Sequence, residues 1–172
     1  LGASDLALKG RELALQVGSP ASRITVGVLQ LKPGVANIVP AEAFLTYEIR
    51  EQSAELLKLL AQKSQGLAAD IAKTWGLEVS VDTILQIDPV PLAEDVKAAI
   101  AAAAGGIGLQ SLRMPAMAGH DAQVVGRVAP AGMIFVPSQD GRSHSPLEFT
   151  ADQDVERGAN VLLLTLLKLA AE

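Results

Sequence analysis

The chain has 172 residues, is 49% hydrophobic and carries a formal net charge of −5, a composition typical of a folded globular protein. The acidic balance, with 14 lysines and arginines against 19 aspartates and glutamates, argues against a nucleic-acid partner. The absence of cysteine excludes disulfides and a thiol nucleophile, and it fits the reducing cytoplasm, where we expect the protein to act. No apolar run approaches the roughly 18 residues of a membrane span, so we expect no membrane contact.

The first half of the chain predicts one α+β domain. Its expected elements are a helix over residues 6–17, strands over residues 24–31 and 43–49, a helix over residues 53–75 and a strand over residues 77–87. Lys32-Pro33-Gly34 indicates a tight turn, which would make the first two strands a hairpin. Ser53 and Gly76 have the residue types that cap and end the long helix. If one more strand precedes Leu1, this order is that of a ferredoxin-like sandwich.

Two prolines in Asp88-Pro89-Val90-Pro91 indicate a boundary, after which helices and strands alternate. The expected elements are helices over residues 92–104, 121–128 and 152–171 and strands over residues 110–114 and 133–136. Thr150 and Gln153 have the spacing of a capping box for the last helix.

Two strands cannot cover the three helices expected in the second half, which therefore looks like part of an α/β domain. The chain also begins at Leu1 without a methionine. We expect a fragment of a longer protein, with an apolar face that is exposed or covered by another chain.

Both histidines lie in polar loops of the second half. His120 follows Ala118-Gly119, and His144 follows an Asp140-Gly141 turn. Polar loops after buried strands are where α/β folds place chemistry, although a loop histidine is more often simply solvated. A zinc site needs several ligands, and a local set of His144, His120 and Asp121 is disfavoured because adjacent residues splay apart. The preferred hypothesis is that ligands from other sequence complete the site.

Two blocks of sequence resemble one enzyme family. AGHDAQ followed by PAGMIFVPSQDGRSHSPLEF resembles the C-terminal signature of the hydantoinase/carbamoylase amidases, and TVGVLQLKPGVANIVPAEAFLTYEIR resembles their lid segment. The family includes N-carbamoyl-L-amino-acid hydrolases, ureidopropionases and allantoate amidohydrolases, within the aminoacylase-like metallopeptidase group. The resemblance covers nearly the whole chain.

The resemblance implies an α/β metallohydrolase with two zinc or manganese ions and a ferredoxin-like lid that forms a homodimer. Residues 1–88 would be the lid, and residues 89–172 the C-terminal part of the catalytic domain. The substrate would be a small N-carbamoyl or ureido compound with a carboxylate, hydrolysed at a linear C–N amide bond.

The resemblance also assigns roles to individual residues. His144 matches a metal ligand, Asn37 and Arg50 match lid residues that hold the substrate, and Gly119 and His120 match a loop on the substrate side. The remaining ligands and the glutamate that acts as general base lie upstream in the family and have no counterpart here. We therefore assign no catalytic residue to this chain and expect it to be inactive alone.

Each assignment has a simpler alternative. Arg50 could form only a surface salt bridge with Glu48 or Glu51, and Asn37 could cap a turn. Glu148 is interpreted as a charge near a helix end, with support of the metal ligand as the alternative. For the whole protein, the alternatives are an aminoacylase or peptidase of the same group, or, for this chain alone, a non-catalytic dimerisation module.

Departures from the family pattern affect the expected substrate range more than the fold. The family's Ser-Gly-Ala-Gly-His-Asp is Ala116-Met117-Ala118-Gly119-His120-Asp121 here, and its Asp-Leu-Arg is Glu48-Ile49-Arg50.

Overall fold

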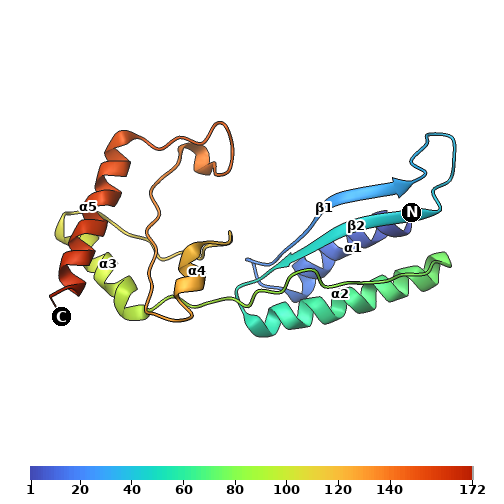
Figure 1. Cartoon of the computed structure of the whole chain (residues 1–172), viewed down its shortest axis with the longest axis horizontal. Coiled ribbons are helices and arrows are strands. Elements are labelled where there is room, and N and C mark those ends of the chain that lie inside the picture. The colour runs from blue at the N-terminus through green and yellow to red at the C-terminus, as the bar shows by residue number, and fades with distance from the viewer. Residues whose placement is uncertain (172) are drawn as a thin grey trace. The chain divides into compact units, whose positions relative to one another are not determined.

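The computed structural model describes residues 1–171 and divides into two compact units. The first spans Leu1–Pro89 and the second begins at Val90 (Figure 1). Helices and one two-stranded sheet make up the described structure, so the chain is a mixed helix and strand protein. None of the described helices is both long and apolar enough to cross a membrane.

The first unit is a hairpin with two helices on one face. Its elements are α1 (Gly2–Val17), β1 (Arg23–Lys32), β2 (Glu42–Arg50) and α2 (Ala54–Trp75) (Figure 1). The two helices pack on each other, α1 contacts β1, and α2 contacts β2. Leu60 of α2 is fully buried at this junction, together with small or aliphatic residues, namely Ala14, Ala68, Ile71 and Ala72.

The hairpin is antiparallel and runs from the pair Arg23–Arg50 at one end to the pair Lys32–Glu42 at the other. Its connection is longer than the tight turn predicted from the sequence. Residues 33–41 form an exposed loop closed by a hydrogen bond from the Ala41 N–H to the Lys32 carbonyl at 2.9 Å.

The predicted boundaries of α2 are confirmed. Ser53 caps the helix by accepting a hydrogen bond from the Leu56 N–H at 3.3 Å, and Gly76 ends it in the left-handed conformation with φ of 62°. The strand predicted over residues 77–87 is wrong, because this segment is not part of a ladder. A strand needs a neighbour to satisfy its backbone, and the described residues offer this segment none.

The second unit is built from two packed helices and long connections. Its elements are α3 (Glu94–Gly106), α4 (Asp121–Val125), the 3₁₀ turn η1 (Gln139–Gly141) and α5 (Asp152–Leu169). α3 packs against α5, and their buried residues are mostly small, namely Ala99, Ala104, Val161 and Thr165.

The strands predicted over residues 110–114 and 133–136 are also wrong, since neither pairs with another strand among the described residues. The second of these segments still runs against the helices. A Cβ at Gly132 would lie 2.5 Å from Val96 Cγ1 of α3, and one at Gly158 of α5 would lie closer still to Val136 Cγ1, so the segment lies close to both helices. The prediction of a buried strand is nevertheless wrong in burial as well as in pairing, since Phe135 is 53% and Val136 37% exposed.

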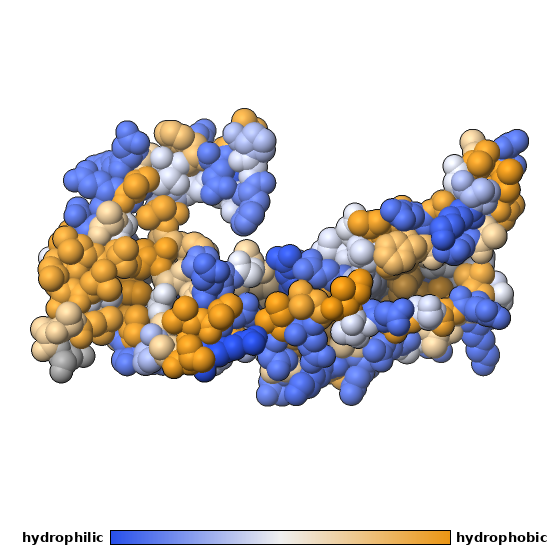
Figure 2. Space-filling view, in the orientation of Figure 1, coloured by the Kyte–Doolittle hydropathy of each residue, from blue (hydrophilic) through white to orange (hydrophobic). Residues whose placement is uncertain are grey.

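The last helix packs through a narrow face. Its buried residues are Val161 and Thr165, while several of its leucines are exposed, with Leu162 at 50% and Leu167 at 60%. Hydrophobic residues gather over α5 and α3 in the space-filling view (Figure 2). The predicted capping box is wrong, because the helix begins after Ala151, which has no side-chain acceptor.

Candidate functional site

Arg50 is the last residue of β2 and projects from the open face of the hairpin. Arg50 and Arg23 are both exposed, whereas their neighbours Ile49 and Ile24 are half-buried toward the helices. The Arg50 Nη2 donates to Glu48 Oε1 at 2.9 Å, so the salt bridge proposed as the alternative is present. Both side chains are about half exposed, at 46% and 55%. Such a pair is worth about 0–1 kcal/mol, so another carboxylate could replace Glu48 at little cost.

Asn37 lies at the opposite end of the hairpin from Arg50. It is exposed in the middle of the loop over residues 33–41, beyond the pair Lys32–Glu42. Eight residues of strand separate Glu42 from Arg50, which is about 26 Å at roughly 3.3 Å per residue. The structure therefore does not bring the two predicted lid residues of one chain together.

Glu51 is a buried carboxylate that the sequence analysis did not single out. Only 8% of the residue is exposed. Its Oε2 accepts hydrogen bonds from the Ser22 hydroxyl and from the Ser19 hydroxyl at 2.8 Å. Its Oε1 accepts from the backbone N–H of Gln52 at 2.6 Å and of Ser53 at 3.1 Å. Burial raises the pKa of Glu51, but these donors outweigh it and lower the pKa from 4.5 to about 2.

His144 adopts a conformation that is unusual for a residue with a side chain. Its φ is 55°, in the left-handed region, which costs on the order of 1–3 kcal/mol and often marks a functional position. Its backbone N–H donates to Glu148 Oε2 at 2.7 Å, and its Nδ1 is hydrogen-bonded to the Ser143 hydroxyl at 2.8 Å. The remaining ring nitrogen, Nε2, has no partner among the described residues, so the exposed imidazole can offer one ligand atom.

Glu148 was wrongly interpreted as a helix-end charge. It precedes α5 by several residues, and its carboxylate instead holds the backbone of His144. At the base of the loop that carries His144, the Gln139 N–H donates a hydrogen bond to the Phe149 carbonyl at 2.8 Å. Asp140 and Gly141 both have positive φ and form the turn before His144, as the sequence indicated.

Gly119 and His120 immediately precede α4. His120 is the N-cap, and its Nδ1 accepts a hydrogen bond from the Ala122 N–H at 3.0 Å. Because Nδ1 accepts this hydrogen bond, the ring proton lies on Nε2. The ring itself is exposed. Gly119 is also exposed, and a Cβ there would meet nothing within 4 Å.

The described residues supply one candidate metal ligand and not a complete site. No group of three or more histidines, aspartates and glutamates in the described part of the chain could hold a metal ion. The local set of His144, His120 and Asp121 is therefore wrong. His144 is suited to be one ligand, because a hydrogen bond fixes its ring through Nδ1 and leaves Nε2 accessible.

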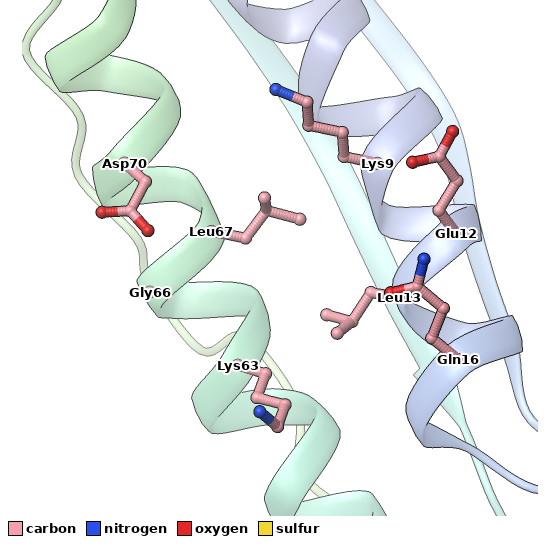
Figure 3. A pocket seen from close by; sticks show the side chains of 8 residues that line it. All are labelled: Lys9, Glu12, Leu13, Gln16, Lys63, Gly66, Leu67 and Asp70. Carbon is pink, nitrogen blue, oxygen red and sulfur yellow. The ribbon is translucent and has the colours of Figure 1, made fainter.

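A groove with a volume of about 460 Å³ lies between α1 and α2 (Figure 3). Leu13 and Leu67 point toward each other across it, and charged residues of both signs surround them. None of the predicted site residues lines this groove. Its balanced charge indicates no particular ligand.

Comparison with known proteins identifies the class of protein to which these two units belong. The sequence model of peptidase family M20/M25/M40 matches residues 8–168. The chain therefore belongs to this family.

Several relatives within the family are named amidohydrolases. The chain is 38% identical over 148 residues to the allantoate amidohydrolase of Bacillus subtilis, a match that covers 86% of this chain and 36% of that protein. It is 34% identical over 139 residues to the N-carbamoyl-L-amino-acid amidohydrolase of Paenarthrobacter aurescens, covering 81% of this chain and 34% of the relative.

A solved amidase of the hydantoinase/carbamoylase family from Burkholderia multivorans has the same fold over 99% of this chain, with a TM-score of 0.92 and 33% identity. The match covers 41% of that structure. The resemblance to hydantoinase/carbamoylase amidases is thus confirmed, and the chain spans well under half the length of the relatives it matches.

Proposed function

We propose that this chain is part of a metal-dependent amidohydrolase that cleaves a linear C–N amide bond in N-carbamoyl amino acids or related ureido compounds. The observation that carries the proposal is the similarity over nearly the whole chain to relatives named for such reactions. A cytoplasmic location remains part of this proposal.

Arg50 would bind the substrate carboxylate. Its guanidinium is planar and can donate to both carboxylate oxygens, which a lysine cannot do with the same geometry. Its present partner Glu48 is exposed and weakly bound, so a substrate carboxylate could take its place. The family's aspartate at this position is a glutamate here, and this longer acid can reach the guanidinium of Arg50 from the same strand.

The chain's contribution to a metal centre would be His144. A zinc or manganese ion supplies a Lewis acid and an activated water in hydrolases of this kind. Glu148 and Ser143 would hold the histidine so that Nε2 faces outward. The ligands that complete the centre and the general base would come from sequence outside this chain.

The distance between Asn37 and Arg50 supports a dimer. A strand of about 26 Å is much longer than an N-carbamoyl amino acid, so one substrate cannot touch both residues of the same chain. If both residues bind one substrate, they must come from two subunits. We therefore propose a two-fold dimer through a ferredoxin-like lid, in which each substrate meets Arg50 of one subunit and Asn37 of the other.

The function is tested by replacing Arg50 in the full-length protein that carries this chain. Losing a desolvated, charge-assisted pair costs about 2–5 kcal/mol, so we expect Arg50→Ala to lower kcat/KM for an N-carbamoyl amino acid by roughly two to three decades. Arg50→Lys should also be impaired, because lysine lacks the planar guanidinium that donates to both carboxylate oxygens. The loss should be much smaller for a substrate without the carboxylate, and metal content should not change.

Arg11→Ala is the matched control, since Arg11 is an exposed arginine of α1 in the same unit. It should leave both substrates unaffected. Equal losses on both substrates for Arg50→Ala would show that Arg50 is structural and that the substrate assignment is wrong.

The dimer is tested by mixing two inactive variants. Asn37→Ala and Arg50→Ala proteins should each be nearly inactive, but a mixed dimer would contain one site with both residues intact. Random exchange makes half of the dimers mixed, so we expect recovery of roughly a quarter of the wild-type sites. No recovery after confirmed subunit exchange would place both residues in one subunit's site or outside it.

Activity on a panel of N-carbamoyl amino acids, N-acyl amino acids and dipeptides distinguishes the proposal from an aminoacylase or peptidase. If the full-length protein hydrolyses none of them and binds no metal, the alternative of a non-catalytic dimerisation module is favoured.

A further inference from the structure

Glu51 connects two loops at the end of the hairpin that carries Arg50. Ser19 and Ser22 belong to the connection between α1 and β1, whereas Gln52 and Ser53 lie between β2 and α2. The carboxylate accepts hydrogen bonds from both connections, so one buried side chain fixes the position where β1 begins relative to where β2 ends. Ser53 also caps α2, which anchors the second loop to the longest helix of the unit.

The backbone geometry links Glu51 to Arg50. Successive residues of an extended chain point to opposite faces, so a side chain held inward at one position directs its neighbour outward. Ile49 faces the helices, Arg50 is exposed and Glu51 is buried, which continues this alternation past the end of the strand. Because Glu51 is held on the inner side, Arg50 cannot rotate inward without breaking these hydrogen bonds.

A carboxylate is a costly choice for a buried position. An ionised group there costs several kcal/mol of desolvation, which only a full set of hydrogen-bond donors offsets. Glu51 has donors for both of its oxygens, at the hairpin end where Arg50 and its strand partner Arg23 are both exposed. Glu51 therefore makes the backbone rigid at the position that sets the orientation of Arg50.

We propose that Glu51 is a positioning residue for Arg50, holding the end of β2 so that the guanidinium is presented to the substrate carboxylate. This inference rests on the proposed role of Arg50 in substrate binding. Glu51 acts through the backbone and does not itself touch the substrate. It would set affinity for the carboxylate and leave the chemical step unchanged.

The test uses Glu51→Gln in the full-length protein. Glutamine keeps the shape, its oxygen can still accept from Gln52 and Ser53, and its amide can face the serine hydroxyls, which can turn to accept. The loss of charge-assisted bonds loosens the strand end. We expect KM for an N-carbamoyl amino acid to rise about tenfold, a smaller effect than the roughly hundredfold loss that a misplacement of about 1 Å can produce. We expect kcat to stay unchanged, and a substrate without a carboxylate to be unaffected.

The double variant with Arg50→Ala separates positioning from general stability. If Glu51 acts through Arg50, Glu51→Gln should have no further effect on KM once Arg50 is absent. The matched control is Glu55→Gln, which removes another carboxylate bonded to Ser53, at 2.7 Å, in the first turn of α2. It should change neither KM nor kcat.

Equal effects of Glu51→Gln on both substrates, or an effect that persists without Arg50, would overturn the inference in favour of a purely structural role. No change in KM would overturn it as well. If Arg50→Ala itself shows no preference for the carboxylate substrate, the proposed function fails instead. Ser22→Ala is the second variant if Glu51→Gln does not fold, because it removes one donor to Oε2 and should raise KM with the same dependence on Arg50.

Discussion

Acid should weaken the first unit, in part through the buried carboxylate of Glu51. Its pKa is lowered from 4.5 to about 2 in the folded state by hydrogen bonds from Ser22, Ser53, Ser19 and Gln52, which outweigh the effect of burial. A lowered pKa means that the folded protein prefers the ionised form. The stabilisation is therefore complete above the unfolded value near 4.5 and is lost as the pH falls toward 2.

The size of the effect follows from the two pKa values. They differ by about two and a half pH units, and each unit corresponds to about 1.4 kcal/mol, so ionised Glu51 contributes about 3 kcal/mol at neutral pH. About 2 kcal/mol of this should be lost by pH 3. Screening by solvent lowers this free energy only slightly, because only 8% of Glu51 is exposed.

The assay is urea unfolding of the wild-type protein and of Glu51→Gln, followed by circular dichroism at pH 7, 5, 4 and 3. Asp5, Glu55 and Glu94 also have lowered pKa values, but they titrate in both proteins and cancel in the difference. The stability advantage of the wild type over Glu51→Gln should shrink by about 2 kcal/mol between pH 7 and pH 3. A difference that stays constant over this range would show that the Glu51 carboxylate is not held as described.

Three further predictions follow from individual contacts. Gly10→Ala should destabilise the first unit by about 1–3 kcal/mol, since the new Cβ would collide with the ring of Tyr47. Gly66→Ala in α2 meets nothing within 4 Å and should stabilise the unit by about 0.5–1 kcal/mol. Thermal unfolding checks both variants, and a change of stability in the same direction for both would refute the described packing. Glu148→Gln should lower the zinc content of the full-length protein about tenfold, as measured by mass spectrometry, and unchanged content would exclude a role in holding His144. This 172-residue chain alone should bind zinc or manganese weakly and hydrolyse nothing, and stoichiometric metal lost on His144→Ala would contradict this.

Local signals in the sequence were enough to predict the helices. α2 begins after Ser53 and ends at Gly76 as expected, because capping depends on residues close together in the chain. The strands without a partner were mispredicted for a physical reason. Residues 77–87 and 133–136 have strand-like composition, but a ladder depends on a neighbouring strand that the described residues do not include.

The candidate site was predicted unevenly. The residues singled out by their motifs, Arg50 and His144, lie in exposed positions that allow the expected roles. Glu51 and Glu148 were missed or misinterpreted because each is an ordinary acid in a polar stretch. Their importance comes from donors up to 32 residues away for Glu51 and from a backbone N–H in an unusual conformation for Glu148, and neither pattern can be recognised in the sequence.

Arg50 and His144 are held by polar contacts and not by a hydrophobic core. The Glu51 carboxylate binds the backbone N–H groups that follow Arg50, and the Glu148 carboxylate binds the backbone N–H of His144, while the apolar core of the first unit centres on Leu60. Core packing supplies most of the free energy of unfolding, whereas these hydrogen bonds also set the orientation of single side chains. Substitution of Glu148 should therefore change ligand binding more than stability, whereas substitution of Glu51 should change both, since ionised Glu51 also contributes about 3 kcal/mol at neutral pH. Substitutions in the core should lower stability more than they change ligand binding, because they loosen the packing of the helices but keep the hydrogen bonds of Glu51 and Glu148.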